Sequence, residues 1–66
     1  MAVLYSVKVS SGTQVQYYRT EFYIEALNLV AELFDKLGEN IKILIKKLFY
    51  NSCGDLIQEE IKMNII

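Results

Sequence analysis

The chain lacks several residue types on which enzyme sites and secreted folds depend. Its 66 residues include no histidine, no proline and no tryptophan, with one cysteine and three glycines. Without histidine, a single copy cannot build Ser-His or Cys-His nucleophiles or histidine-ligated metal sites. The glycines, Gly12, Gly38 and Gly54, are isolated at expected turns and form no phosphate-binding loop. We therefore expect no enzyme, no metal site and no cofactor.

The single cysteine and the lack of long apolar runs indicate the cellular compartment of the protein. Cys53 cannot form an intramolecular disulfide, and secreted domains of this size usually carry several. Residues 1–9 show no signal-peptide pattern, because Lys8 interrupts their apolar character. No apolar run approaches the roughly 20 residues needed to cross a bilayer. These features predict a soluble cytoplasmic protein that does not span a membrane.

Size, charge and apolar content limit the partners. The chain is 53% hydrophobic, with a formal charge of −1 and a pI of about 5.2. So small a domain has too much surface for its volume to hide this much apolar material, so we expect a homodimer. The slight negative charge removes any general attraction to phosphate backbones. Nucleic acid is therefore an unlikely partner and would need a local patch.

The first twenty residues predict a hairpin. Residues 2–9 alternate between apolar and mixed positions, the period of a half-buried strand. Residues 10–13 form a turn cluster in which Gly12 can adopt a positive φ. Residues 14–20 are polar and aromatic, which suits a strand at the edge of a sheet.

From about Glu21 the period changes to that of a helix, which runs to Leu37. Its apolar side is formed by Tyr23, Ala26, Leu27, Val30, Leu33, Phe34 and Leu37. We expect Thr20 as the N-cap and Gly38 as the residue that ends the helix. The apolar arc is wider than one supporting surface requires, which indicates a further contact on its flank.

Residues 41–50 are ambiguous between strand and helix. Ile41, Ile43 and Ile45 alternate as in a strand, whereas Ile41, Leu44, Ile45 and Leu48 fit helical spacing. We choose a strand, because β-branched residues disfavour helix and residues 51–55 resemble a hairpin loop. A bulge near Lys46-Lys47 would reconcile the two phases. A fourth strand follows, with Ile57, Ile61, Met63 and Ile65 expected on one side and Glu60, Lys62 and Asn64 on the other.

These elements predict an α+β fold of order ββαββ, one domain over residues 1–66, with a four-stranded sheet and one helix packed across one face. The layout resembles the small β-grasp domains of the protein G and protein L type over nearly the whole chain. That resemblance implies that the first and fourth strands are central and parallel. Lys42, Lys46 and Lys47 would then guard an edge formed by the third strand. No motif of those domains is matched, so their antibody binding is not implied.

Two charged surfaces are candidates for binding. An acidic helix face is formed by Glu21, Glu25, Glu32, Asp35 and Glu39. It is either a solvated face or a surface that docks on a basic partner, including a nucleic-acid-handling protein. A basic and aromatic sheet face is formed by Lys8, Tyr18, Arg19, Lys42, Lys46 and Lys62. It could hold single-stranded nucleic acid by stacking and charge, although a charge ladder that keeps the sheet in solution is favoured.

Apolar residues without an inward assignment predict self-association. Leu29, Leu44 and Leu48, together with Leu4 and Ile66, would form a contact patch for a homodimer through the helix flank or an edge strand. The leading hypothesis is a non-catalytic protein-binding module, an inhibitor or adaptor that blocks a surface of its partner. In character the chain resembles small phage and mobile-element proteins, including anti-CRISPR-type inhibitors, which act in the host cytoplasm. The alternatives are a nucleic-acid-binding sheet and a self-assembling structural subunit.

Overall fold

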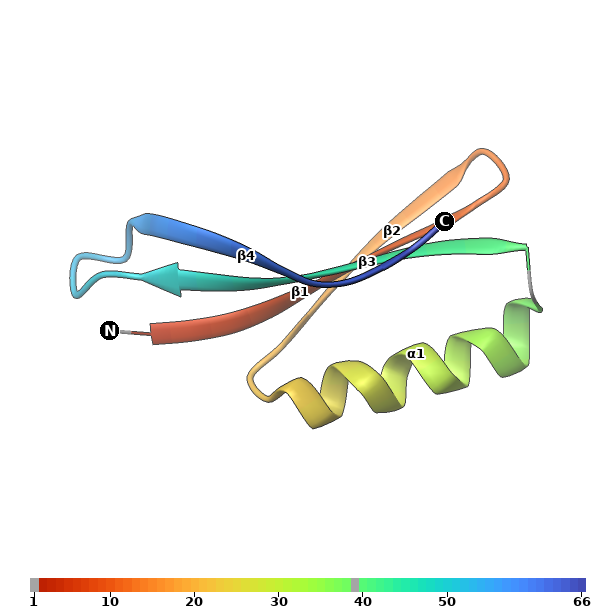
Figure 1. The fold of residues 1–66 in the computed structure, drawn as a ribbon, viewed down its shortest axis with the longest axis horizontal. Helices are drawn as coiled ribbons and strands as arrows, with labels where there is room; N and C mark the ends of the chain where they lie inside the picture. The colour runs from red at the N-terminus through yellow and green to blue at the C-terminus, as the bar shows by residue number, and fades with distance from the viewer. Residues whose placement is uncertain (1, 39) are drawn as a thin grey trace.

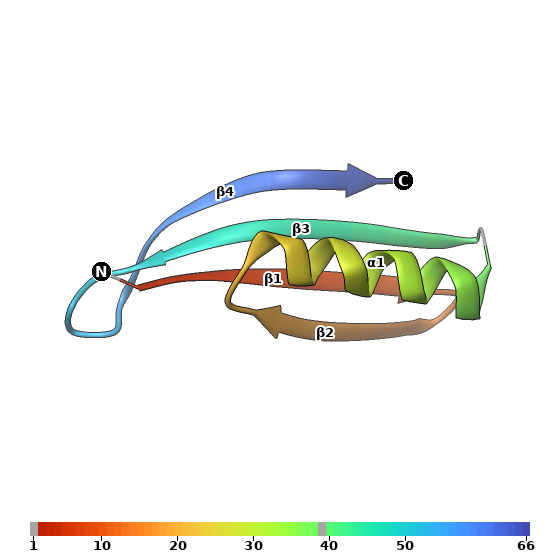
Figure 2. The same ribbon diagram turned by 90° about the horizontal axis from the view of Figure 1, so that it is seen from below.

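One helix lies across one face of a four-stranded sheet (Figures 1 and 2). The structure, a computed structural model, describes residues 2–38 and 40–66. The elements are β1 (Ala2–Ser11), β2 (Gln14–Thr20), α1 (Tyr23–Leu37), β3 (Ile41–Tyr50) and β4 (Leu56–Ile65). The predicted α+β class and ββαββ order are confirmed. Residues 41–50 form a strand.

The strand order differs from the one that the β-grasp resemblance implied. The sheet runs β2-β1-β3-β4, and every neighbouring pair is antiparallel. The prediction that β1 and β4 are central and parallel was therefore wrong. The physical reason is overall apolar content, because each strand carries three charged residues, but seven of the ten residues of β3 are apolar against five of the ten of β4. The more apolar strand takes the middle, and the more polar strand takes an edge.

The position of β3 also changes the roles expected for its lysines. Lys42 and Lys46 lie on a central strand, opposite Ser10 and Ser6 of β1, so they do not guard an edge. Lys47 lies opposite Tyr5, and its ammonium sits 5.0 Å from the centre of the Phe49 ring.

Two bulges reset the alternation of β4. Ile45 pairs with Met63 and Lys46 pairs with Ile61, so Lys62 is an extra, unpaired residue on β4. Near the hairpin, Ile57 is an extra residue of β4 in the same way. The bulge predicted near Lys46-Lys47 is therefore present, but the inserted residue belongs to β4. As a result, Ile61 lies on the opposite face from Met63, which corrects their predicted common side.

The helix ends are set by local hydrogen bonds. The N-cap is Phe22, so the prediction of Thr20 was wrong. Thr20 is the last residue of β2, and its hydroxyl donates a hydrogen bond to the Phe22 carbonyl at 3.2 Å. The Phe22 N–H donates to Glu25 Oε1 at 3.1 Å, which satisfies one free helix-end amide with a carboxylate at the positive end of the dipole. Gly38 ends the helix as predicted, with φ of +80°, and donates its N–H to the Phe34 carbonyl at 3.0 Å.

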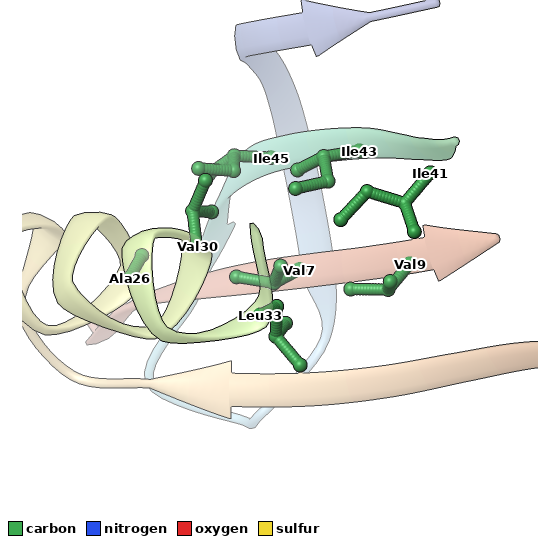
Figure 3. Close-up of a cluster of buried hydrophobic side chains, with 8 residues drawn as sticks. All are labelled: Val7, Val9, Ala26, Val30, Leu33, Ile41, Ile43 and Ile45. Atoms are coloured by element: carbon green, nitrogen blue, oxygen red, sulfur yellow. The ribbon is translucent and has the colours of Figure 1, made fainter. Parts of the chain in front are cut away.

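The hydrophobic core lies between α1 and the two central strands. Its buried members are Val7, Val9, Ala26, Val30, Leu33, Ile41, Ile43 and Ile45. Figure 3 shows Val30 of the helix pointing toward Ile45 of β3, with Val7 near them on β1 and Val9 farther along the same strand. Removing each large aliphatic side chain from water contributes about 1.5–3 kcal/mol. The core is thus one-sided, because only the helix-facing side of the sheet has a covering layer among the described residues.

Candidate interaction surface

The face of the sheet opposite α1 is left uncovered by residues 2–38 and 40–66, and we call it the open face. Successive strand residues point to opposite faces, so the residues that alternate with the core lie on this side. The register places Lys8 opposite both Tyr17 and Leu44, and Lys46 opposite Ile61. By the same register the open face includes Leu4, Ser6, Lys8, Ser10, Val15, Tyr17, Arg19, Lys42, Leu44, Lys46, Leu48, Glu59 and Ile61.

The open face is cationic although the whole chain is slightly acidic. It gathers Lys8, Arg19, Lys42 and Lys46 against Glu59, four positive charges against one negative charge, a net of +3. Lys46 Nζ lies 3.9 Å from Glu59 Oε2, with both side chains partly exposed, so this pair contributes at most about 1 kcal/mol.

The helix side of the molecule has the opposite sign. Residues 21–38 carry four carboxylates and one lysine, Lys36, a net of −3. The two sides of the molecule therefore differ in charge, and each presents a distinct field to a partner.

Two shallow hollows lie along the open face. One, of about 210 Å³, is lined by Lys8, Lys42 and Leu44 among others. The second, of about 220 Å³, is lined by Lys8, Lys46, Leu44, Leu48 and Tyr17 among others. Lys8 and Leu44 line both hollows. Each hollow thus combines aliphatic lining with ammonium groups, a surface that suits a partner with both apolar and acidic groups.

The apolar residues of the open face differ in exposure. Leu48 is only 6% exposed, although it lies outside the core cluster, opposite Leu4 and Glu59. Tyr17 and Ile61 are 69% and 63% exposed. These two exposed residues lie on the opposite edge strands, β2 and β4, with the lysines and leucines of β1 and β3 between them.

The structure brings together four of the six residues predicted for the basic and aromatic face: Lys8, Arg19, Lys42 and Lys46. It places Tyr18 on the other side, opposite Val7 and packed against the core, with its hydroxyl donating to Gln16 Oε1 at 2.6 Å. Lys62 is the bulge residue of β4, and its ammonium lies 3.6 Å from Glu60 Oε1.

The register places two aromatic residues on the open face, Tyr17 of β2 and Tyr50 of β3, and neither was among the predicted site residues. The sequence of the β1–β2 hairpin is sufficient to place Tyr17 on this face. A two-residue turn at Gly12-Thr13 fixes the register, and counting back from it pairs Lys8 with Tyr17.

The acidic residues predicted for the helix face differ in their local surroundings. Glu25 is engaged as a capping group, and Glu21 precedes the helix. Glu32 and Asp35 are exposed on the helix. Glu39 lies outside the described residues. Because the Glu25 carboxylate accepts the capping hydrogen bond, Glu32 and Asp35 are the exposed acidic residues of the helix without a capping role.

The predicted self-association residues do not form one patch. Leu29 packs against the core from the helix, while Leu44 and Leu48 lie on the open face, so the sheet separates them. Ile66, which is 89% exposed just beyond the end of β4, lines the same hollow as Leu44. Contact through Leu29 and contact through Leu44 and Leu48 would therefore be two different interfaces.

Other site types find no support in the described ranges. No group of three or more carboxylates or thiols there is placed to hold a metal ion. Cys53 is exposed in the β3–β4 loop, where its N–H donates to Asn51 Oδ1 at 3.0 Å. No helix in those ranges has the length and apolar character to span a membrane. Comparisons with protein-family models, with curated proteins and with solved structures found no match.

Proposed function

We propose that the chain is a non-catalytic binding module that attaches through its open face to an acidic surface of another protein, as an inhibitor or adaptor covering that surface. The observation that carries this proposal is the uncovered sheet face itself, where lysines surround aliphatic side chains. A partner that covers the face removes Leu44 and Ile61 from water and pairs its carboxylates with Lys8 and Lys42.

A protein partner fits this face better than nucleic acid does. Sheets that hold single strands present aromatic rings on which bases stack. Here Tyr18 packs against the core, and the two aromatic residues of the open face lie far apart, Tyr17 at the level of Leu44 and Tyr50 at the level of Ala2. The open face also has a single arginine, Arg19, and phosphate recognition relies heavily on arginine. Aliphatic groups gain from burial against apolar protein surface instead.

Two double variants with the same charge change test the proposal. Lys8→Glu with Lys42→Glu reverses two charges of the open face, and neither side chain is in a salt bridge within the described residues. Lys36→Glu with Lys47→Glu is the matched control, with one change on the helix and one on the helix-facing side of β3. Each pair takes the formal charge from −1 to −5, because each substitution changes it by −2.

Affinity purification from the cells that make the protein, with and without nuclease, measures which partner each form retains. We expect one protein to co-purify in stoichiometric amount with the parent chain and with the control, to survive nuclease, and to be lost by the open-face variant. Retention by the open-face variant would overturn the proposal. Loss of the partner on nuclease treatment would favour nucleic-acid binding instead.

A further inference from the structure

The two edges of the sheet are protected to very different degrees. Edge strands expose unpaired backbone groups, and proteins blunt them with charges, bulges or proline. The β4 edge has two bulges, at Ile57 and Lys62, and three charged residues among its ten. The β2 edge pairs with β1 in unbroken register from Gln14 to Thr20 and carries one charge, Arg19. Within residues 2–38 and 40–66, no further strand pairs with β2.

The residues whose backbone groups face the free side of β2 follow from its hairpin. Ser11 and Gln14 close a two-residue turn, with Gly12 at a φ of +61°, and the closing pair of such a turn is hydrogen-bonded. Bonded and non-bonded pairs alternate along an antiparallel ladder. Val15, Tyr17 and Arg19 therefore direct their amide and carbonyl groups away from β1, toward the free edge.

We infer that β2 pairs with β2 of a second copy of the chain, antiparallel and centred on Tyr17, to form a continuous eight-stranded sheet. In this register Tyr17 meets its own copy and Val15 lies opposite Arg19 of the second copy. No like charges face each other, and on the order of six backbone hydrogen bonds form. The pairing also covers part of Val15, which is 48% exposed, and of Tyr17.

The helices leave room for this pairing. The two-fold axis is perpendicular to the sheet, so both helices lie on the same side and both open faces lie on the other. Each helix packs against β1, with β2 and β3 on either side (Figure 2). The two helices are then three strand spacings apart, about 14 Å. This exceeds the 8–10 Å of packed helices, so the helices do not collide.

Charge changes at Val15 test the register, with the full-length chain in sedimentation velocity over a wide concentration range. Val15→Lys places two like-charge pairs against Arg19 in each dimer and is expected to raise the dimer dissociation constant about fivefold or more. Val15→Glu is expected to lower it. Val15→Lys combined with Arg19→Glu restores attraction and is expected to return the constant toward that of the parent chain.

Gln58→Lys adds the same charge to the exposed β4 edge and serves as the matched control, with no expected effect on the constant. The inference is overturned if the parent chain stays monomeric throughout the range. It is overturned equally if Val15→Lys and Val15→Glu move the constant in the same direction, or if Gln58→Lys acts as strongly as Val15→Lys. The assay measures self-association alone, so its outcome is independent of the proposed partner binding.

Discussion

Alternate residues of β3 belong to two different surfaces. Ile43 and Ile45 are 1% and 0% exposed beneath the helix, whereas Leu44 and Lys46, their immediate neighbours, lie on the open face. The helix covers the first set, and no described element covers the second. The covered set stabilises the fold, and the other set belongs to the surface that we propose for binding. Adjacent positions of one strand therefore face different surroundings.

The largest expected effect comes from the covered side. Ile45→Ala removes a fully buried side chain from the centre of the core and should lower the free energy of unfolding by about 2–5 kcal/mol. Leu44→Ala, one residue earlier, should cost less, about 1 kcal/mol, because Leu44 is only partly buried and lines an open hollow. Urea denaturation measures both. Equal losses in the free energy of unfolding would contradict the difference in burial between the two faces.

The next effect in size concerns Leu48, which is buried by its neighbours on the open face without a helix above it. Leu48→Ala should cost about 2 kcal/mol, at the low end for buried leucines, because the surrounding side chains can collapse into the space. The same denaturation assay applies. A loss as large as that of Ile45→Ala would indicate a second packed layer over this face.

A smaller effect separates the acids of the helix. Glu25→Ala removes the acceptor of the Phe22 N–H and should cost about 1 kcal/mol. Glu32→Ala, on the exposed side of the same helix, should change the free energy of unfolding by less than about 0.5 kcal/mol. Thermal unfolding followed by circular dichroism compares the two. If Glu32→Ala cost as much as Glu25→Ala, the capping role would not distinguish them.

The smallest expected effect is that of the Lys46–Glu59 pair on the open face. A double-mutant cycle through Lys46→Ala and Glu59→Ala should give a coupling of about 0.5 kcal/mol or less, which decreases with added salt. A coupling above about 2 kcal/mol at high salt would mean that this pair is shielded from water. That result would contradict an open face.

Local sequence patterns predicted the elements but not their arrangement. Two patterns depend only on residues close in sequence: the alternation of Ile41, Ile43 and Ile45, and the helical period after Tyr23. Both therefore predicted their elements correctly. The place of β3 beside β1 depends on a competition between two distant strands, which local alternation does not reveal. Isoleucines and charges do not separate the two strands, since each has three of both; the signal that would have favoured β3 is its larger number of apolar residues, seven against five.

The candidate surface was predicted in part for the same reason. Lys8, Lys42 and Lys46 follow from simple alternation, so their common face was found. The face of Tyr18 depends on the length of the Gly12-Thr13 turn. That of Ile61 depends on a bulge, and a shift of one residue moves a side chain to the other face.

The most direct test of the open face is methyl cross-saturation NMR on the complex with the protein partner that the affinity purification is expected to yield. Saturation of the partner should spread to the methyl groups of Leu44 and Ile61 and leave those of Ile43 and Ile45 unaffected, although these lie on the same or the adjacent strand. Saturation of Ile24, on the exposed side of the helix, with none at Leu44 and Ile61, would contradict the account.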